Sequence, residues 1–158
     1  MKKYGLIAII VAALDQIVKA YVRSFPLGES IWEIPGILSF THCVNTGAAF
    51  SVMAGYTAAI AVLSIGLLAG IGVYVICKLH LTMMAWMAVA FLAGGGIGNL
   101  MDRLLFSGVT DYIRLQFIDF PVFNLADIAI TGSISVLLFL LVSDALEIPT
   151  EDKHGSDR

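Results

Sequence analysis

The residues in this sequence that could do acid–base chemistry are carboxylates, since the other usual catalytic sets do not assemble. The three histidines fall in three separate polar segments, so they are not expected to share a metal ion: His42, His80 and His154. No serine stands in the Gly-x-Ser-x-Gly pattern of a nucleophile elbow. Two neighbouring carboxyl groups can activate water without a metal or another cofactor, one as the base and the other as the acid. The candidates for that chemistry are Asp15, Asp102, Asp111 and Asp127.

Polar residues recur at the ends of long apolar segments, and these ends are predicted to meet on one side of the protein. Asp15 and Lys19 are four residues apart, which places them on one helical face in the favourable acid-before-base order. Asn99 and Arg103 are likewise one helical turn apart. Ionisable groups within apolar segments are costly and usually functional. The predicted polar cluster consists of Asp15, Lys19, Asn45, Asn99, Asp102, Arg103, Asp111, Asn124 and Asp127.

The composition identifies the surroundings in which this cluster must work. Of the 158 residues, 59% are hydrophobic and 13% are charged, and the mean hydropathy is +0.92. Soluble domains are about 45–50% apolar and about 25% charged, and a chain of this size has too little interior to hide the excess. The net charge of -3 offers no basic surface for nucleic acid. The sequence therefore predicts an integral membrane protein.

The predicted fold is all-α and polytopic, with four transmembrane helices and a small extracytoplasmic β-element in one membrane domain, residues 1–158. A helix needs about 20 apolar residues to cross the hydrocarbon layer, and residues 58–77 and 81–101 carry no charge. The first and last uncharged runs are shorter, so their spans must include Asp15 and Asp127. The predicted spans are about residues 5–22, 58–77, 81–102 and 125–145, and a polar tail follows at 147–158.

An even number of spans places both termini on one side of the membrane. Lys2 and Lys3 precede the first span and favour a cytoplasmic N-terminus. The polar cluster would then face the extracytoplasmic side. The same lysines before an apolar run also fit a cleaved signal peptide, an alternative that Asp15 and Lys19 disfavour.

The β-element is predicted at about residues 30–45 and 111–120. Apolar and polar side chains alternate through residues 38–44, which is the periodicity of a half-buried strand. Residues 108–111 are interpreted as a glycine loop that presents Asp111. We therefore expect a small sheet at the membrane surface, beside the polar cluster.

Glycine spacing predicts close helix packing in two of the spans. Gly66 and Gly70 are four residues apart, as are Gly94 and Gly98, and such pairs let neighbouring helices approach closely. The glycine run at 94–98 follows no strand, so it lacks the context of a nucleotide-binding loop.

Five blocks of residues, in order along the chain, resemble the motif series of lipoprotein signal peptidase, also called signal peptidase II. The blocks are Asp15-Gln16 with Lys19, the Asn-Thr-Gly-Ala-Ala-Phe of residues 45–50, Gly98-Asn99-Leu100 with Asp102-Arg103, Asp111, and the Asn-Leu-Ala-Asp of residues 124–127. The likeness runs from about residue 14 to residue 131. The chain departs from the family pattern at Ile128, where a small hydroxyl residue is common, and at Thr110 and Tyr112, where valine and phenylalanine are usual.

The resemblance implies a membrane aspartic endopeptidase with Asp111 and Asp127 as its catalytic pair. It implies roles in substrate binding or in support of the site for Asn45, Asn99, Arg103, Asn124, Asp15, Lys19 and Asp102. The implied substrate is a prolipoprotein whose cysteine carries a diacylglyceryl group, cleaved just before that cysteine. The implied setting is a bacterial cytoplasmic (inner) membrane, with membrane lipids as neighbours, the active site on the extracytoplasmic side and both termini in the cytoplasm. We expect a monomer that uses no metal or other cofactor.

Three alternatives remain open at this stage. A small transporter could use Asp127 to couple protons, but it would be expected to show repeated halves, and none is visible. A non-enzymatic membrane scaffold would tolerate the loss of either aspartate. A presenilin-like protease would place a Gly-x-Gly-Asp motif deep within a span, whereas residues 108–111 are predicted to lie in a loop.

Overall fold

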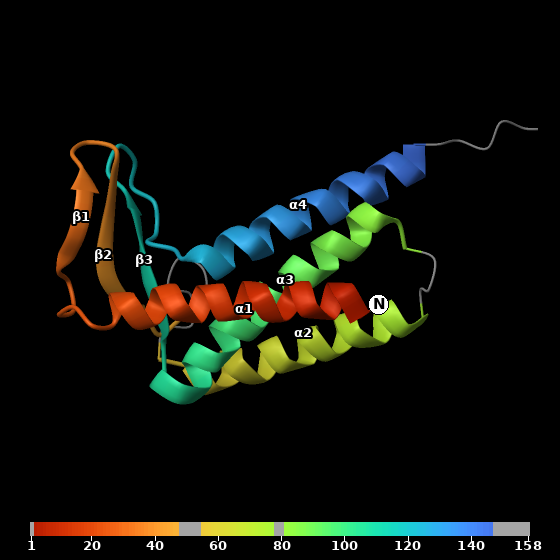
Figure 1. The fold of residues 1–158 in the computed structure, drawn as a ribbon, viewed down its shortest axis with the longest axis horizontal. Coiled ribbons are helices and arrows are strands. Elements are labelled where there is room, and N and C mark those ends of the chain that lie inside the picture. Colours follow the sequence, from red (N-terminus) through yellow and green to blue (C-terminus); the bar gives the residue numbers. More distant parts are fainter. Residues whose placement is uncertain (1, 48–54, 78–80, 147–158) are drawn as a thin grey trace, which may run out of the picture.

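The computed structural model describes residues 2–47, 55–77 and 81–146. In these residues four helices extend roughly along the long axis, with the third packed against each of the other three, and a small sheet lies across one end of them (Figure 1). The helices are α1 (Lys2–Val22), α2 (Thr57–Cys77), α3 (Met83–Phe106) and α4 (Leu125–Leu146). The strands are β1 (Ser30–Ile34), β2 (Leu38–Asn45) and β3 (Val109–Leu115). The mostly helical architecture with a small sheet agrees with the prediction.

Three of the helices have the length and apolarity needed to cross a membrane, over Lys2–Val22, Met83–Phe106 and Leu125–Ser143. In α2 the described apolar stretch is shorter, Thr57–Val73. The helix count is consistent with four spans, and the number that cross the bilayer stays a prediction. The predicted tail at 147–158 lies outside the described residues.

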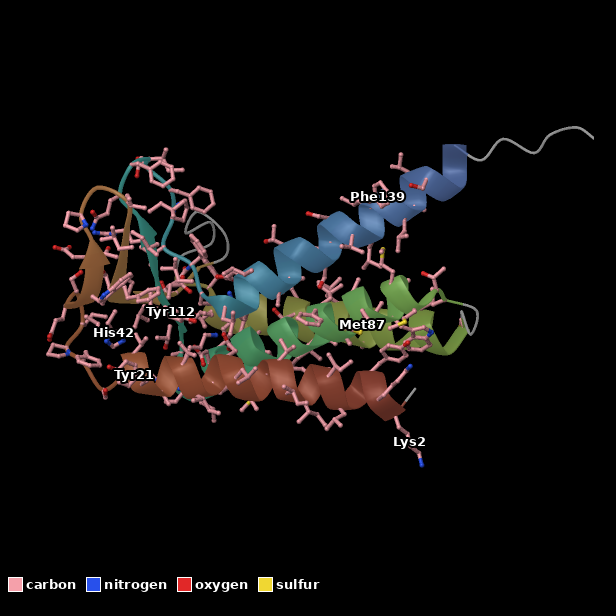
Figure 2. All side chains as sticks on the ribbon, turned by 45° about the horizontal axis from the view of Figure 1, so that its top comes forward. Lys2, Tyr21, His42, Met87, Tyr112 and Phe139 are labelled. Carbon is pink, nitrogen blue, oxygen red and sulfur yellow. The ribbon has the colours of Figure 1, made fainter. Side chains whose placement is uncertain are left out.

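Large apolar side chains cover the outer faces of the helices, as expected where the surroundings are lipid rather than water. Ile9 in α1 and Leu141 in α4 are each 65% exposed, and Phe139 points outward from α4 (Figure 2). A soluble protein of this size rarely exposes apolar area on this scale. Most of the buried polar and charged side chains lie in the sheet or at the end of the helices that meets it.

Helix α3 packs closely against α1 and α4 because glycines line its contact faces. A Cβ atom at Gly94 would lie 2.7 Å from the backbone oxygen of Ala8 in α1, and one at Gly95 would lie 2.7 Å from that of Ala126 in α4. The packing prediction is wrong for Gly66 and Gly70, where an added Cβ would meet nothing within 4 Å. Both of these α2 glycines are exposed, since small residues permit a close approach but do not provide the neighbour.

Gly94→Ala is therefore expected to destabilise the protein by about 1–3 kcal/mol, because the new methyl group meets backbone that cannot move aside cheaply. The matched control is Gly70→Ala, which has open space and gains up to about 1 kcal/mol of helix propensity. Thermal unfolding of both variants in the same detergent measures the difference. Equal stability of the two variants would contradict the packing shown by α3.

The strands form an antiparallel sheet in the order β1-β2-β3, and this sheet carries Asp111. Asp111 lies opposite Cys43 of β2, after a bulge that shifts the register between Phe40 and Cys43. The predicted boundary of 111–120 and the loop at 108–111 are corrected here, since β3 begins at Val109 and ends at Leu115. The first four residues of β3 are all buried, so no alternation in the sequence marks its start.

Candidate active site

A cavity of about 650 Å³ opens where the sheet meets α3 and α4. Its polar lining includes Asn45 from β2, Asn99 and Arg103 from α3, Asp111 from β3, and Asp127 and Thr131 from α4. Most of its remaining wall is apolar and includes Val109, Val122 and Phe123, and Ile128 and Ile130 from α4. Polar residues from four separate elements thus share one cavity, as the clustering of polar groups predicted.

Asp111 is held in place by two asparagine side chains. Its Oδ1 accepts a hydrogen bond from Asn124 Nδ2 at 2.6 Å, and its Oδ2 accepts one from Asn45 Nδ2 at 3.1 Å. Burial raises the pKa of Asp111 to about 7. The negative charge of Asp127 also raises this pKa, whereas the two hydrogen bonds lower it. Asp111 can therefore hold a proton near neutral pH.

Asp127 lies in the first turn of α4 and forms a reciprocal cap with Asn124. Asn124 N donates to Asp127 Oδ2 at 3.1 Å, and Asp127 N donates to Asn124 Oδ1 at 2.9 Å. This exchange between the capping residue and the third residue of the helix has the form of a capping box. Asp127 Oδ1 also accepts from Asn99 Nδ2 at 2.8 Å. The carboxylate of Asp127 thus has a fixed donor on each oxygen at a helix N-terminus, where negative charge is favoured.

Asp15, Lys19 and Asp102 form a buried charge network next to the cavity and do not line it. All three side chains are 0% exposed; Lys19 Nζ lies 2.8 Å from Asp15 Oδ2 and 3.5 Å from Asp102 Oδ2. Asp102 also accepts from the backbone nitrogen of Thr110 at 2.8 Å, so it holds the strand just before Asp111. The network therefore contacts the backbone beside Asp111 and does not open onto the cavity.

Arg23, which is not among the predicted site residues, belongs to the same network. Arg23 Nη1 lies 3.3 Å from Asp102 Oδ1 and donates to Thr110 Oγ1 at 3.0 Å. Its position was a usable signal, since Arg23 is one turn beyond Lys19 and two turns beyond Asp15. Continuing the helical face past the apolar segment would have found it.

Arg103 makes a hydrogen bond to the segment that follows β2. Its Nη2 donates to the backbone oxygen of Gly47 at 3.2 Å, and its Nη1 donates to that of Asn99 at 3.3 Å. Its Nε is buried and has no hydrogen-bond partner within the described part of the chain. The rest of the predicted block, residues 48–50, lies outside the described residues.

The described geometry suits general acid–base chemistry. Among the residues that the structure describes, no three His, Cys, Asp or Glu side chains group as metal ligands would. Two carboxyl groups share the cavity instead, and burial raises the pKa of one of them, Asp111, to about 7. Such a pair can deprotonate a water molecule and protonate a carbonyl oxygen.

The comparison with known protein families decides among the functions that such a pair allows. A family model described as signal peptidase (SPase) II matches residues 7–143, which is most of the chain. The chain belongs to the signal peptidase II family. The family assignment confirms the resemblance carried by the five sequence blocks, and with it the predicted enzyme class, a membrane aspartic peptidase. It also favours that class over the transporter and the scaffold.

Individual signal peptidase II relatives cover nearly the whole chain. The lipoprotein signal peptidase of Gloeobacter violaceus is 40% identical over 154 residues, which is 97% of this chain and 89% of the relative. That of Streptococcus pneumoniae is 35% identical over 152 residues, covering 92% of this chain and 98% of the relative. A bacterial membrane enzyme solved in meso at 2.3 Å resolution superposes with a TM-score of 0.86 at 27% identity, covering 100% of this chain and 96% of that one.

Proposed function

We propose that this signal peptidase II cleaves diacylglyceryl-modified prolipoproteins just before the lipidated cysteine, using Asp111 and Asp127 to activate water. Removal of signal peptides from prolipoproteins is the activity of its family. The observation that carries the finer proposal is that both aspartates line one cavity and are bonded to the same asparagine, Asn124. The enzyme would work as a monomer on the extracytoplasmic side of the inner membrane, with both termini cytoplasmic.

In the proposed mechanism the two aspartates divide the acid and base roles. Asp127, which carries a hydrogen-bond donor on each oxygen, acts as the base and takes a proton from water as the water oxygen attacks the scissile carbonyl. Asp111 is protonated and gives its proton to the carbonyl oxygen. When the C–N bond breaks, Asp127 passes its proton to the leaving amine, and Asp111 recovers one from the gem-diol. The step consumes one water and leaves both aspartates as they began.

The cavity has an apolar and a polar side, which suits a substrate that is part lipid and part peptide. The apolar side, which includes Ile128 and Ile130, belongs to α4 and suits acyl chains that arrive from the bilayer. The polar side offers Arg103, whose guanidinium group lines the cavity and can donate to a substrate carbonyl. Asn45 lines the same cavity and can bind the peptide backbone.

Removing the lipid from the substrate tests this proposal. We expect a synthetic precursor with an unmodified cysteine to be cleaved at least about 10²-fold more slowly than the same peptide with a diacylglyceryl cysteine, because buried acyl chains contribute binding energy. Mass spectrometry of the products from the enzyme purified in detergent gives both the rate and the cleaved bond. Equal rates on the two peptides, or cleavage elsewhere, would show that the cavity does not select the lipid.

A further inference from the structure

We infer that Lys19 is a positioning residue for this peptidase, because it fixes the side-chain amide of Asn99 in the one orientation that donates to Asp127. Lys19 Nζ donates to Asn99 Oδ1 at 2.7 Å, and Asn99 Nδ2 donates to Asp127 Oδ1 at 2.8 Å. The inference deepens the proposed function and rests on the role given there to Asp127.

The orientation of the amide follows from its two unlike ends. An asparagine amide has an acceptor oxygen on one side and an NH2 donor on the other. If the amide of Asn99 turned over, its NH2 group would face the ammonium of Lys19 and its oxygen would face the carboxylate of Asp127. Asn124 Nδ2 also donates to Asn99 Oδ1, at 3.2 Å. Every one of these contacts favours the orientation in which Asn99 donates to Asp127.

Lys19 can set this orientation because it is itself held rigidly. Its ammonium lies between the carboxylates of Asp15 and Asp102, and all three side chains are 0% exposed. Asp15 is anchored in turn by the backbone nitrogen of Ala126, which donates to its Oδ1 at 3.1 Å. Ala126 directly precedes Asp127, so the network and the catalytic aspartate are attached to the same turn of α4. Gly98 completes the arrangement, since a Cβ atom there would overlap Asp15 Oδ2.

The burial of Lys19 determines which kinetic constant it should affect. Lys19 does not line the cavity, so it cannot contact a bound peptide. Its effect must pass through Asn99 to the carboxylate that takes the proton from water. A misplaced carboxylate slows the chemical step and leaves substrate affinity unchanged.

The test is a double-mutant cycle on kcat with the diacylglyceryl precursor. Lys19→Met is expected to lower kcat by about 10²-fold with KM changed less than about threefold. Asn99→Leu should lower kcat by a similar factor, and the two together should lower it no further, because they interrupt one path. The inference is overturned if the two losses multiply, or if Lys19→Met keeps near wild-type kcat.

Lys19→Met leaves Asp15 and Asp102 with one cation fewer, which can prevent folding. The double variant Asp15→Asn/Lys19→Met removes one charge of each sign and should show the same loss of kcat. The matched control is Arg23→Met, which takes a cation from the same network but makes no hydrogen bond to Asn99. Its kcat should fall by a smaller factor than that of the double variant, because the hydrogen bond from Lys19 to Asn99 is still made. A loss in Arg23→Met equal to that of the double variant would overturn the inference.

The outcome for Lys19 is separable from the fate of the proposed function. Wild-type cleavage of the lipidated precursor, lost in Asp127→Asn, establishes the role of Asp127 without reference to Lys19. If Asp127→Asn retains activity, the proposed mechanism fails. If Asp127→Asn is inactive while the Lys19 variants are fully active, the positioning role alone fails.

Discussion

Asp111→Asn and Asp127→Asn are each expected to lower kcat/KM on a diacylglyceryl-modified precursor by about 10³-fold or more. An asparagine keeps the shape of the side chain, but its amide neither takes the proton from water nor supplies one to the carbonyl oxygen. Both carboxyls are also held by fixed donors, so no nearby group replaces them easily. Single-turnover cleavage by the purified variants, followed by mass spectrometry, measures the loss.

Asp119→Asn is the matched control for these two variants. Asp119 is an exposed aspartate that lines a neighbouring, more polar cavity and not the one that holds Asp111 and Asp127. Its variant should cleave at the wild-type rate. Folding of every variant is checked by thermal unfolding in detergent. If a folded Asp111→Asn or Asp127→Asn cleaves at near the wild-type rate, the two-aspartate mechanism is wrong.

The stability of the protein is expected to fall as the pH rises from about 4 to about 7, because of Asp111. Burial raises the pKa of Asp111 from its ordinary 3.8 to about 7, so in this range the folded state holds a proton that the unfolded state has released. The stabilisation is fully present below about pH 4 and is lost as the pH passes about 7. Its size is on the order of 4 kcal/mol, from about three pKa units.

The pH dependence of kcat/KM should also reflect the protonation of Asp111. If protonated Asp111 is the acid, kcat/KM should fall about tenfold per pH unit above about pH 7. Thermal unfolding of wild type and Asp111→Asn between pH 5 and pH 8 isolates the stability effect, since the variant should lose most of the slope. Parallel slopes in the two proteins would mean that Asp111 does not hold the proton in the folded state.

The features that the sequence predicted well are those carried by local chemistry. Long uncharged segments are most stable as helices that cross or border a bilayer, so the four helices could be predicted from the sequence. Ionisable residues inside such runs are rare, and this rarity identified Asp15 and Asp127 before any geometry was known. The ordered blocks then indicated the family.

The features that the sequence could not give depend on neighbours that are distant along the chain. The start of β3 was misplaced because Val109, Thr110, Asp111 and Tyr112 are covered on both sides, which removes the alternation that reveals a strand. Figure 2 shows Tyr112 in that covered region, between the sheet and the helix ends. The packing of α2 was predicted wrongly because glycine spacing shows where a helix has small side chains and does not show which helix lies beside it.

The division between lining and supporting residues was equally beyond the sequence. Asn99 and Lys19 belong to blocks of the same family pattern, yet one lines the cavity and the other is wholly buried beneath it. That difference arises from how α1 and α3 pack, which is decided by close backbone contacts such as that of Gly94 with Ala8. No residue type or local spacing carries this information.

The cap shared by Asn124 and Asp127 has a consequence for resistance to inhibitors. A compound that hydrogen-bonds to Asp127 engages atoms that also begin α4. A substitution there that evades the compound would also weaken the start of the helix, at a cost of about 1 kcal/mol in addition to the lost catalysis. Resistant strains should therefore carry substitutions in the apolar lining of the cavity, at positions such as Ile130, while its polar lining residues stay unchanged.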